Sequence, residues 1–319
     1  MVPKLYMAPI RGFTDTVYRN IFSKHFDGFD IAVAPFISTQ MGKRIKSSQH
    51  KALLPENNTG MPVIPQILSK DPDGFVILAK HLFDMGYESI NWNLGCPFPK
   101  VARKGRGSGM LPFPDIIESF LEKTLSAIPN TLSIKTRLGY NNENEIFLII
   151  PIFNRYPLEE IIIHPRTGIQ MYEGTPDLDT FEKCLLQSAH PVVYNGDITD
   201  LDTFRTLSGR FENINRWMIG RGALTNPFLP ATIKNDEDIF PNKIERMKRF
   251  HDALFHEYRQ ILNGPSHLLQ RMKSFWKYFV LSFENSRKNQ KKIQKTTSVE
   301  QYEEIVARFF ETGNLKLND

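Results

Sequence analysis

The sequence predicts an α/β protein: a (β/α)₈ TIM barrel followed by a small C-terminal helical domain. Eight short apolar runs bounded by turn residues are typical of buried strands. Their first residues lie 25 to 43 residues apart, the repeat expected for a strand joined to one crossover helix. Beyond residue 241 this alternation stops, and only helical patterns remain. Repeated strand–helix alternation favours a parallel sheet that closes on itself.

The predicted strands are apolar runs of the length that a buried strand needs. Gly, Pro, Asn or Asp residues stand near their ends, where the chain must turn. In chain order the predicted strands are Leu5–Ile10, Asp30–Ile37, Pro62–Leu68, Ser89–Leu94, Leu132–Leu138, Glu160–Pro165, Pro191–Gly196 and Arg216–Gly220.

Most of the segments between these strands carry a helical pattern, with apolar residues on one stripe. Acidic residues open several of them and Gly86 ends one, as the helix dipole and the capping preferences favour. Gln40–Gly60 is polar and basic, and we expect a long loop with one short helix at most. The predicted helices are Asp15–Phe26, Asp71–Met85, Phe113–Ile128, Asp177–Ala189 and Asp200–Phe211.

The alternative architecture is an open, doubly wound sheet. Such a sheet usually carries a glycine fingerprint after its first strand, and none follows Ile10. The barrel is therefore favoured, and the short acidic segment Asn235–Phe240 marks its end. We expect a catalytic barrel domain at residues 1–238 and a helical domain at residues 239–319.

Composition limits the class of protein. Of the 319 residues, 41% are hydrophobic, which is enough for a large core. No apolar run is long enough to span a bilayer, and the first residues do not resemble a signal peptide. The two cysteines, Cys96 and Cys184, predict neither a disulfide framework nor a metal site. We expect a cytoplasmic protein; the oligomeric state is not determined, and a monomer is the expectation.

The positive charge is concentrated in one part of the chain. The net charge is +5, and residues 241–300 contain 13 Lys and Arg against 5 Asp and Glu. A localised basic segment is typical of a protein that binds a polyanion such as nucleic acid. A solvated, lysine-rich helix face explains the same charge equally well.

Polar or glycine-bearing groups follow seven of the eight predicted strands. In a (β/α)₈ barrel the segments after the strands build the functional site. A repeat of such groups in phase with the strands is more than folding alone requires. The groups are Met7–Pro9, Gln66, Asn93–Pro97, Lys135–Arg137, His164–Arg166, Asn195–Asp197 and Gly220–Gly222.

The last two groups resemble a phosphate site. The loops after strands seven and eight often bind phosphate in this fold, through backbone N–H groups. Gly196 and Gly220 permit a close approach of the backbone, and Arg221 adds charge; Asn195 and Asp197 flank the first loop. Two ordinary turns that close the barrel remain the alternative.

Lys135 and Cys96 carry the expected chemistry. A lysine inside a barrel strand is costly without a partner; it can stabilise the negative charge of a reduced flavin, or form a structural ion pair. His164, on the next strand, can hydrogen-bond the flavin or the substrate carbonyl. Cys96 precedes Pro97 and a flexible basic loop, where a thiol can act as an acid or a nucleophile. Cys184 lies inside a predicted helix, and we expect it to be a buried core residue.

These motifs resemble those of the tRNA-dihydrouridine synthases over essentially the whole chain. They are MAPIRGFTD with Arg19, PQIL, NWNLGCPFPKVARKGRGSGML, SIKTRLG, HPRTGIQMYEG, VVYNGDI, and MIGRGAL with NPFL. The resemblance implies a barrel with bound FMN, NADPH as the reductant, tRNA as the substrate and a helical domain that holds the RNA. Two segments depart from the family pattern, AVAPFIST around Ala34-Pro35 and EGTPDLDTF after Tyr172, and leave the target uridine open.

The resemblance also implies roles for single residues. Cys96 would be the general acid, giving a proton to C5 of uracil after hydride transfer to C6. Ala8, Pro9, Gln66, Asn93, Lys135 and His164 would contact the flavin ring, and Asn195, Gly196, Asp197, Gly220 and Arg221 its ribityl phosphate arm. Lys104, Arg166 and Tyr172 would lie near the substrate.

The RNA surface is predicted from the helical domain. Arg271, Lys273 and Lys277 lie in a segment that mixes cations with aromatic residues, and on a helix only 273 and 277 share a face. Packing is the expected role of Trp276. Two rival functions remain: an FMN-dependent barrel reductase acting on a free pyrimidine or enone, and a non-catalytic RNA-binding protein with the same fold.

Overall fold

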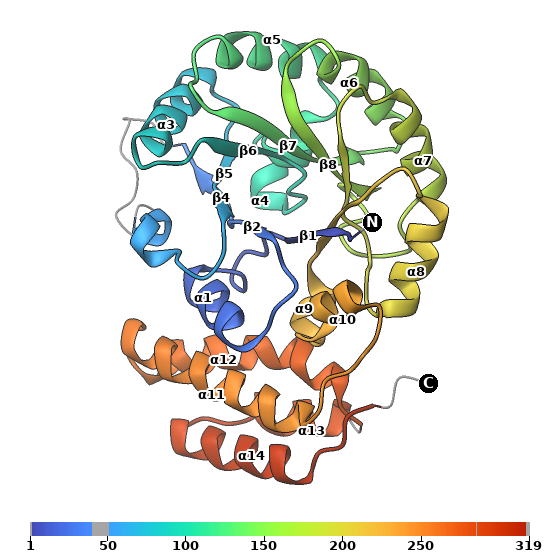
Figure 1. The fold of residues 1–319 in the computed structure, drawn as a ribbon. Helices are drawn as coiled ribbons and strands as arrows, with labels where there is room; N and C mark the ends of the chain where they lie inside the picture. Colours follow the sequence, from blue (N-terminus) through green and yellow to red (C-terminus); the bar gives the residue numbers. More distant parts are fainter. Residues whose placement is uncertain (1, 40–50, 285, 317–319) are drawn as a thin grey trace.

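A computed structural model describes residues 2–39, 51–284 and 286–316, and it confirms the predicted barrel with its helical appendage (Figure 1). The strands form a curved central sheet, helices lie around its outside, and the C-terminal helices form a layer against one side. Residues 40–50 of the predicted loop Gln40–Gly60 lie outside the described residues. No helix in the described part of the chain is long and apolar enough to cross a membrane.

The central sheet is parallel throughout, with the order β3-β5-β6-β7-β8-β9-β10-β1-β2-β4. Every predicted strand is present, with ends that differ by a few residues. The strands are β1 (Lys4–Met7), β2 (Ile31–Val33), β3 (Ile37–Ser38), β4 (Val63–Ile64), β5 (Gln66–Leu68), β6 (Ser89–Leu94), β7 (Thr131–Gly139), β8 (Leu158–Thr167), β9 (Val192–Tyr194) and β10 (Arg216–Ile219).

The second and third predicted strands are each divided in two. Pro35 lies between β2 and β3, and Pro65 lies between β4 and β5. Proline lacks the N–H that a sheet ladder needs, so each strand is interrupted there. β2 pairs with β4 and β3 pairs with β5. The strand order begins with β3 and ends with β4, which are halves of the second and third predicted strands. Because these two strands are neighbours, the segments form one closed eight-stranded barrel.

The longest strands set the register of the polar groups. Asn93 of β6 lies opposite Lys135 of β7, and Arg137 of β7 lies opposite His164 of β8. Because all strands run in the same direction, their carboxyl ends meet at one mouth of the barrel. The register brings these four side chains to that mouth.

The five helices predicted between strands are present. Four of them begin after an aspartate whose carboxylate accepts a backbone N–H of the first turn: Asp15, Asp71, Asp177 and Asp200. The helices are α1 (Thr16–His25), α3 (Pro72–Asp84), α5 (Pro114–Leu125), α7 (Leu178–Gln187) and α8 (Leu201–Arg210).

One outer helix, α6 (Glu145–Phe153), was not predicted. Its sequence EIFLIIPIF is apolar on nearly all sides and contains Pro151, so it lacks an apolar stripe. The carboxylate of Glu145 accepts the backbone N–H groups of Tyr140 and Asn141, which holds the start of the helix. Short helices complete the barrel: η1 (Pro55–Asn57), α4 (Pro99–Ala102), η2 (Gly107–Met110), α9 (Arg221–Thr225) and α10 (Leu229–Asn235).

The C-terminal helices share an apolar core with the barrel. Met7 of β1 and Phe22 of α1 belong to the same buried cluster as Phe250 and Phe275 of the tail. The cluster thus contains residues from both sides of the predicted domain boundary at residue 238. The boundary itself stays a prediction. The tail comprises α11 (Lys243–Ile261), α12 (Pro265–Phe279), η3 (Val280–Ser282), α13 (Ser286–Gln294) and α14 (Val299–Thr312).

Trp276 packs inside the helical tail, as predicted. It is fully buried, and its Nε1 donates to the hydroxyl of Tyr302 at 2.8 Å. That hydroxyl lies 2.7 Å from Nε2 of the buried His251, whose Nδ1 lies 3.0 Å from the carboxylate of Asp252. Satisfied buried polar groups of this kind favour one packing arrangement of the bundle.

Gly222 of α9 is expected to be essential to the fold. A Cβ there would lie 2.0 Å from the backbone oxygen of Ile198. We expect Gly222→Ala to lower the free energy of unfolding by roughly 1–3 kcal/mol or more. The control is Gly209→Ala in α8, where a Cβ meets nothing within 4 Å; a better helix former there should add about 0.5–1 kcal/mol. Urea unfolding of both variants tests this, and equal stabilities would contradict it.

Candidate active site

A row of buried polar side chains links β5, β6 and β7. Gln66 Nε2 donates to Asn91 Oδ1 at 2.7 Å, and Asn91 Nδ2 donates to Ser133 Oγ at 2.8 Å. In the other direction, Asn93 Nδ2 donates to Gln66 Oε1 at 2.7 Å. Asn93 Oδ1 then accepts the backbone N–H of Cys96 at 2.9 Å. The row therefore ends at the backbone of the predicted acid.

The loop after β6 folds back over Cys96. Gly107 has a φ of 57°, and a Cβ there would lie 2.7 Å from the Cys96 oxygen, so glycine is required. Ser108 donates its backbone N–H and its hydroxyl to the same oxygen, at 3.2 and 3.1 Å. Cys96 is thus held from both sides, by Asn93 through its N–H and by Ser108 through its carbonyl.

The thiol of Cys96 is suited to donate a proton. It is partly exposed, whereas Cys184 in α7 is fully buried, as predicted. Burial raises the pKa of the Cys96 thiol, although the Phe98 N–H and the nearby Arg137 favour the thiolate. A thiol with a raised pKa stays protonated at neutral pH, so it has a proton to give.

Lys135 has no counter-ion among the described residues. Its side chain comes from β7 beside Asn93, and it makes no hydrogen bond or ion pair with any described residue. Burial, reinforced by the positive charge of Arg137, lowers the pKa of Lys135 to about 7. Cys96 is close enough that its negative form counteracts this shift. The structural ion pair that was the alternative for Lys135 is therefore not found in the described part of the chain.

Arg166 is fully engaged within the protein. Its Nη1 and Nη2 donate to both oxygens of Asp197, at 3.1 and 2.6 Å. Nε donates to the oxygen of Glu173, Nη2 also donates to that of Gly174, and Nη1 lies 3.1 Å from His164 Nε2. These contacts occupy all five N–H donors of a guanidinium. In this arrangement Arg166 holds its neighbours in place, and its predicted position near the substrate stays a prediction.

The contact with Arg166 determines the tautomer of His164. A guanidinium only donates, so Nε2 of His164 must accept and the proton must reside on Nδ1. Burial, together with the charges of Arg137 and Lys135, lowers the pKa of His164 well below its usual range. His164 is therefore neutral and offers one N–H donor.

Tyr172 lies at the rim of the mouth between two guanidinium groups. Arg221 lies 4.8 Å and Arg137 5.4 Å from the centroid of its ring. Arg221 also donates to Asp197 at 2.6 Å, so these residues form one network. Tyr278 of α12 is near enough to feel the charge of Arg221 on its hydroxyl. The helical tail therefore reaches the rim of the site, through a residue that the sequence analysis did not single out.

The loops after β9 and β10 present unused backbone donors. The N–H groups of Gly196, Asp197, Arg221 and Gly222 donate to no described residue, whereas the Asn195 amide donates to the Met218 oxygen at 2.9 Å. Gly220 is the N-cap of α9. Ala8, at the adjoining end of β1, is buried, and Thr14 Oγ1 donates to its oxygen at 2.9 Å. The arrangement fits the predicted anion site.

Two of the residues predicted to bind RNA make internal contacts instead. Arg271 donates to the oxygen of Gly12 and lies 3.4 Å from the Asp15 carboxylate, in the segment after β1. Lys273 donates to the oxygen of Thr296, after α13. The two side chains point in different directions because residues two apart on a helix do not share a face. Both side chains are only partly buried, and their predicted role in RNA binding stays a prediction.

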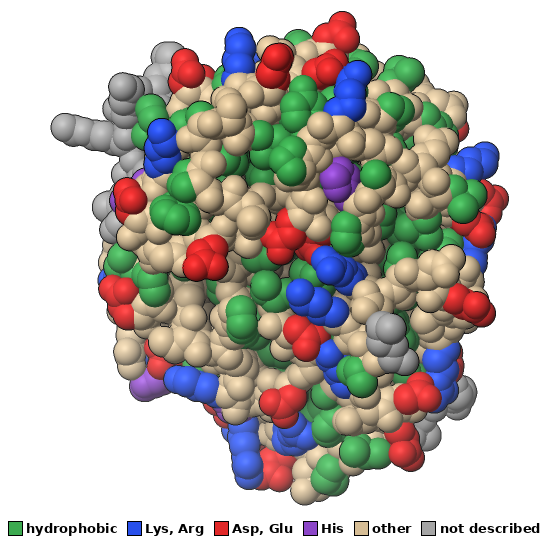
Figure 2. All heavy atoms as spheres, turned by 45° about the horizontal axis from the view of Figure 1, so that its top comes forward, with side chains coloured by type: hydrophobic (Ala, Val, Ile, Leu, Met, Phe, Trp, Pro, Cys, Tyr) green, Lys and Arg blue, Asp and Glu red, His purple; other side chains and the backbone are tan. Residues whose placement is uncertain are grey.

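Lys277 and Lys104 remain accessible. Both side chains are exposed, Lys277 on α12 and Lys104 in the loop that follows α4. On the face of the molecule shown in Figure 2, Lys and Arg side chains are intermingled with Asp and Glu rather than gathered in one patch.

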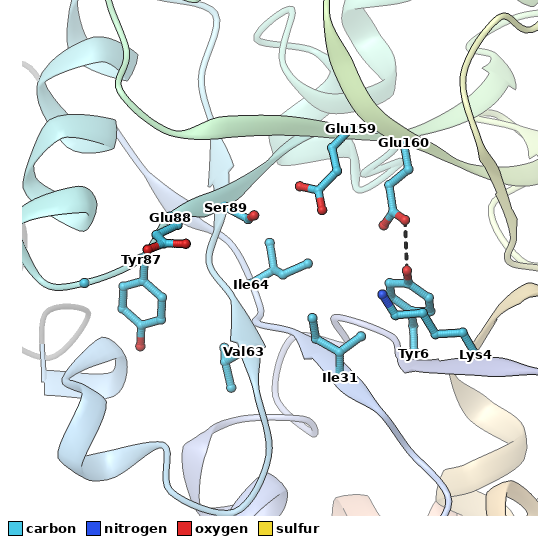
Figure 3. Close-up of a pocket in the computed structure, with 11 residues that line it drawn as sticks. Lys4, Tyr6, Ile31, Val63, Ile64, Tyr87, Glu88, Ser89, Glu159 and Glu160 are labelled. Carbon is cyan, nitrogen blue, oxygen red and sulfur yellow. Dashed lines mark hydrogen bonds between the residues drawn. The ribbon is translucent and has the colours of Figure 1, made fainter.

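A cavity of about 220 Å³ lies at the opposite, amino-terminal mouth of the barrel (Figure 3). Glu160 of β8 accepts the hydroxyl of Tyr6 at 2.9 Å and pairs with Arg216 at 2.7 Å there. Lys4 and Glu159 also line it. None of the predicted site residues lies there, and this face of a (β/α)₈ barrel usually contributes to stability. We therefore place the active site at the other mouth.

Comparison with known proteins shows the family of the chain. Residues 6–312 match the family model described as dihydrouridine synthase (Dus). The chain belongs to the dihydrouridine synthase family. The chain is 30% identical over 227 residues to tRNA-dihydrouridine synthase B of Pasteurella multocida, covering 71% of this chain and 67% of that one. A probable tRNA-dihydrouridine synthase of Staphylococcus epidermidis is 26% identical, covering 96% and 94%.

Solved structures support the fold of the chain. The old yellow enzyme homologue of Zymomonas mobilis superimposes with a TM-score of 0.55 at 11% identity, covering 76% of this chain and 91% of that one. Morphinone reductase gives 0.52 at 11% identity, covering 76% and 88%. Membership of the family confirms the predicted enzyme class, a flavin-dependent oxidoreductase. No cluster of residues suited to a metal ion is found in the described part of the chain.

Proposed function

We propose that this dihydrouridine synthase reduces the C5–C6 double bond of uridine in tRNA to 5,6-dihydrouridine, with bound FMN and with NADPH as the reductant. The observation that carries the proposal is the pair of Lys135 and Cys96 at one mouth of the barrel. The Lys135 ammonium, which has no counter-ion among the described residues, suits an anionic cofactor. The protonated thiol of Cys96 suits a reduction that requires a proton. The relatives named for tRNA-dihydrouridine synthesis support the substrate.

The residues at this mouth fit FMN. Lys135 has no partner in the described part of the chain, and the neutral His164 offers an N–H donor. The free N–H groups of the loops after β9 and β10, with Arg221, suit a phosphate. Ala8, Pro9, Gln66 and Asn93 would line the ring, and Asn195, Gly196, Asp197 and Gly220 would shape the phosphate arm. Bound FMN would supply hydride to C6 of uracil, using electrons from NADPH.

Cys96 would complete the reduction. Hydride and proton must add to C6 and C5 respectively, so the double bond needs an acid beside the base. Cys96 would donate its thiol proton to C5 and later regain a proton from solvent. The uridine must leave its stack to reach the mouth, at a cost of a few kcal/mol. Tyr172, half exposed at the rim, would contact the substrate, while exposed Lys104 and Lys277 would meet phosphates.

The proposal is tested by comparing two substrates. We expect the purified enzyme, supplied with FMN and NADPH, to form dihydrouridine in unmodified transcribed tRNA and to leave free uracil unreduced, as measured by mass spectrometry of digested RNA. Equal reduction of free uracil would favour a pyrimidine reductase. A protein that binds tRNA but retains no flavin would favour the non-catalytic reading. Mapping dihydrouridine in cells with and without the protein would identify the position.

A further inference from the structure

The row of amides that ends at Cys96 has a single possible direction. The N–H groups of Gly95 and Cys96 only donate, so the atom of Asn93 that they contact, at 3.2 and 2.9 Å, must be the oxygen. Its Nδ2 then faces Gln66, which must present its own oxygen. Gln66 Nε2 consequently faces Asn91, which must also present its oxygen.

The far end of the row agrees with this direction. Asn91 Nδ2 is left to donate, and Ser133 Oγ accepts it because the serine hydroxyl gives its own hydrogen to the Ile90 oxygen at 3.2 Å. Asn91 and Ser133 are both fully buried, and Gln66 is 1% exposed. No member can rotate its amide without leaving a buried donor facing another donor, which is unfavourable in a buried site.

From this geometry we infer that Asn91 and Ser133 are positioning residues for Cys96, acting through Gln66 and Asn93. Neither is among the residues that would touch FMN or the uridine. Asn91 holds the Gln66 amide in one orientation, Gln66 holds Asn93, and Asn93 holds the N–H of Cys96. The placement of the thiol therefore depends on a side chain that has no role in binding. The catalytic importance of this positioning rests on the proposed function, whereas the hydrogen bonds themselves do not.

Asn91→Leu is the decisive variant. Leucine has nearly the same size but offers no acceptor, so Gln66 Nε2 loses its partner. The Gln66 side chain, which accepts from Asn93, is then no longer held on the Asn91 side. We expect the rate of dihydrouridine formation from enzyme already reduced by NADPH to fall about tenfold or more, the factor that corresponds to one buried hydrogen bond. Reduction by NADPH in the absence of tRNA should fall much less, because it does not use Cys96.

Two further variants grade the effect. Asn91→Asp keeps an oxygen toward Gln66 and can accept the Ser133 hydroxyl with its second oxygen, so it should recover activity relative to leucine. Ser133→Ala should have a smaller effect, because the Gly95 and Cys96 N–H groups still orient the row from the other end. Thr136→Val is the matched control: Thr136 is a fully buried residue of β7 whose hydroxyl donates to Arg137 O, outside the row.

Alkylation of Cys96 gives a readout that is independent of tRNA. Cys184 is fully buried, so iodoacetamide should modify only Cys96 in the folded protein. We expect Asn91→Leu to change the rate of Cys96 alkylation at least several-fold and to alter its dependence on pH. Thr136→Val should leave both the rate and the pH dependence unchanged. An unchanged alkylation profile in folded Asn91→Leu would overturn the inference. If wild-type protein makes no dihydrouridine but the profiles differ as expected, the proposed function fails and the positioning role stands.

Discussion

Replacing Cys96 with alanine is expected to lower dihydrouridine formation by about 10²–10⁴-fold, the usual contribution of a general acid. The backbone of Cys96 is held at both its N–H and its carbonyl, so loss of the thiol removes the proton and leaves the surrounding loop in place. The variant should keep its flavin and should still be reduced by NADPH. Single-turnover measurements with pre-reduced enzyme and tRNA isolate the affected step.

Cys184→Ala is the matched control for this variant. Cys184 lies in α7 and is fully buried, and burial raises the pKa of its thiol to about 12, so it takes no part in proton transfer. We expect normal turnover with a modest loss of stability from the small cavity. Full activity of Cys96→Ala would show that another group, or water, delivers the proton.

Replacing Lys135 with methionine is expected to weaken FMN binding by about 10- to 100-fold at pH 6–7, the range for losing a charged hydrogen bond. In the wild-type protein the pKa of Lys135 is about 7 before the cofactor binds. A negative partner raises that pKa, so FMN binding takes up a proton above pH 7. The wild-type affinity should therefore fall as pH rises from 7 to 9, by up to roughly tenfold per unit.

The pH dependence distinguishes the lysine from a general loss of folding. Lys135→Met should bind FMN weakly and with no slope between pH 7 and 9, because the titrating group is absent. Lys80→Met, at an exposed position of α3, should keep both the affinity and the slope of the wild type. Fluorescence titration of FMN measures both quantities. A wild-type affinity that does not change across this range would contradict the assignment of Lys135 to the cofactor.

Much of the architecture was predictable because its signals are local. The strand–helix period depends on short apolar runs and on capping aspartates such as Asp71 and Asp200, each of which acts within one turn. The helix Glu145–Phe153 escaped prediction because its residues are apolar on all sides, so periodicity could not distinguish it from a strand. The division of two strands at Pro35 and Pro65 also has a local cause, because proline lacks the backbone N–H that a sheet ladder needs.

The candidate site divides in the same way. Cys96 and Lys135 were identified because a thiol before a proline and a lysine inside a strand are unusual wherever they occur. Asn91 and Tyr278 were missed, since an asparagine in a strand and a tyrosine on an amphipathic helix carry no such signal. Both acquire a role only through neighbours that are distant in the chain.

By itself, then, the sequence determined the parallel barrel, the mouth at which polar residues gather, and the family of the protein, because strand period and strand-end chemistry are properties of contiguous residues. The tertiary structure decided which charges are free. It gives Arg166, Arg271 and Lys273 internal partners and leaves Lys135 without one among the residues that the structure describes. The physical reason is that a donor is satisfied by whatever packing brings within about 3 Å, and packing is set by the whole chain.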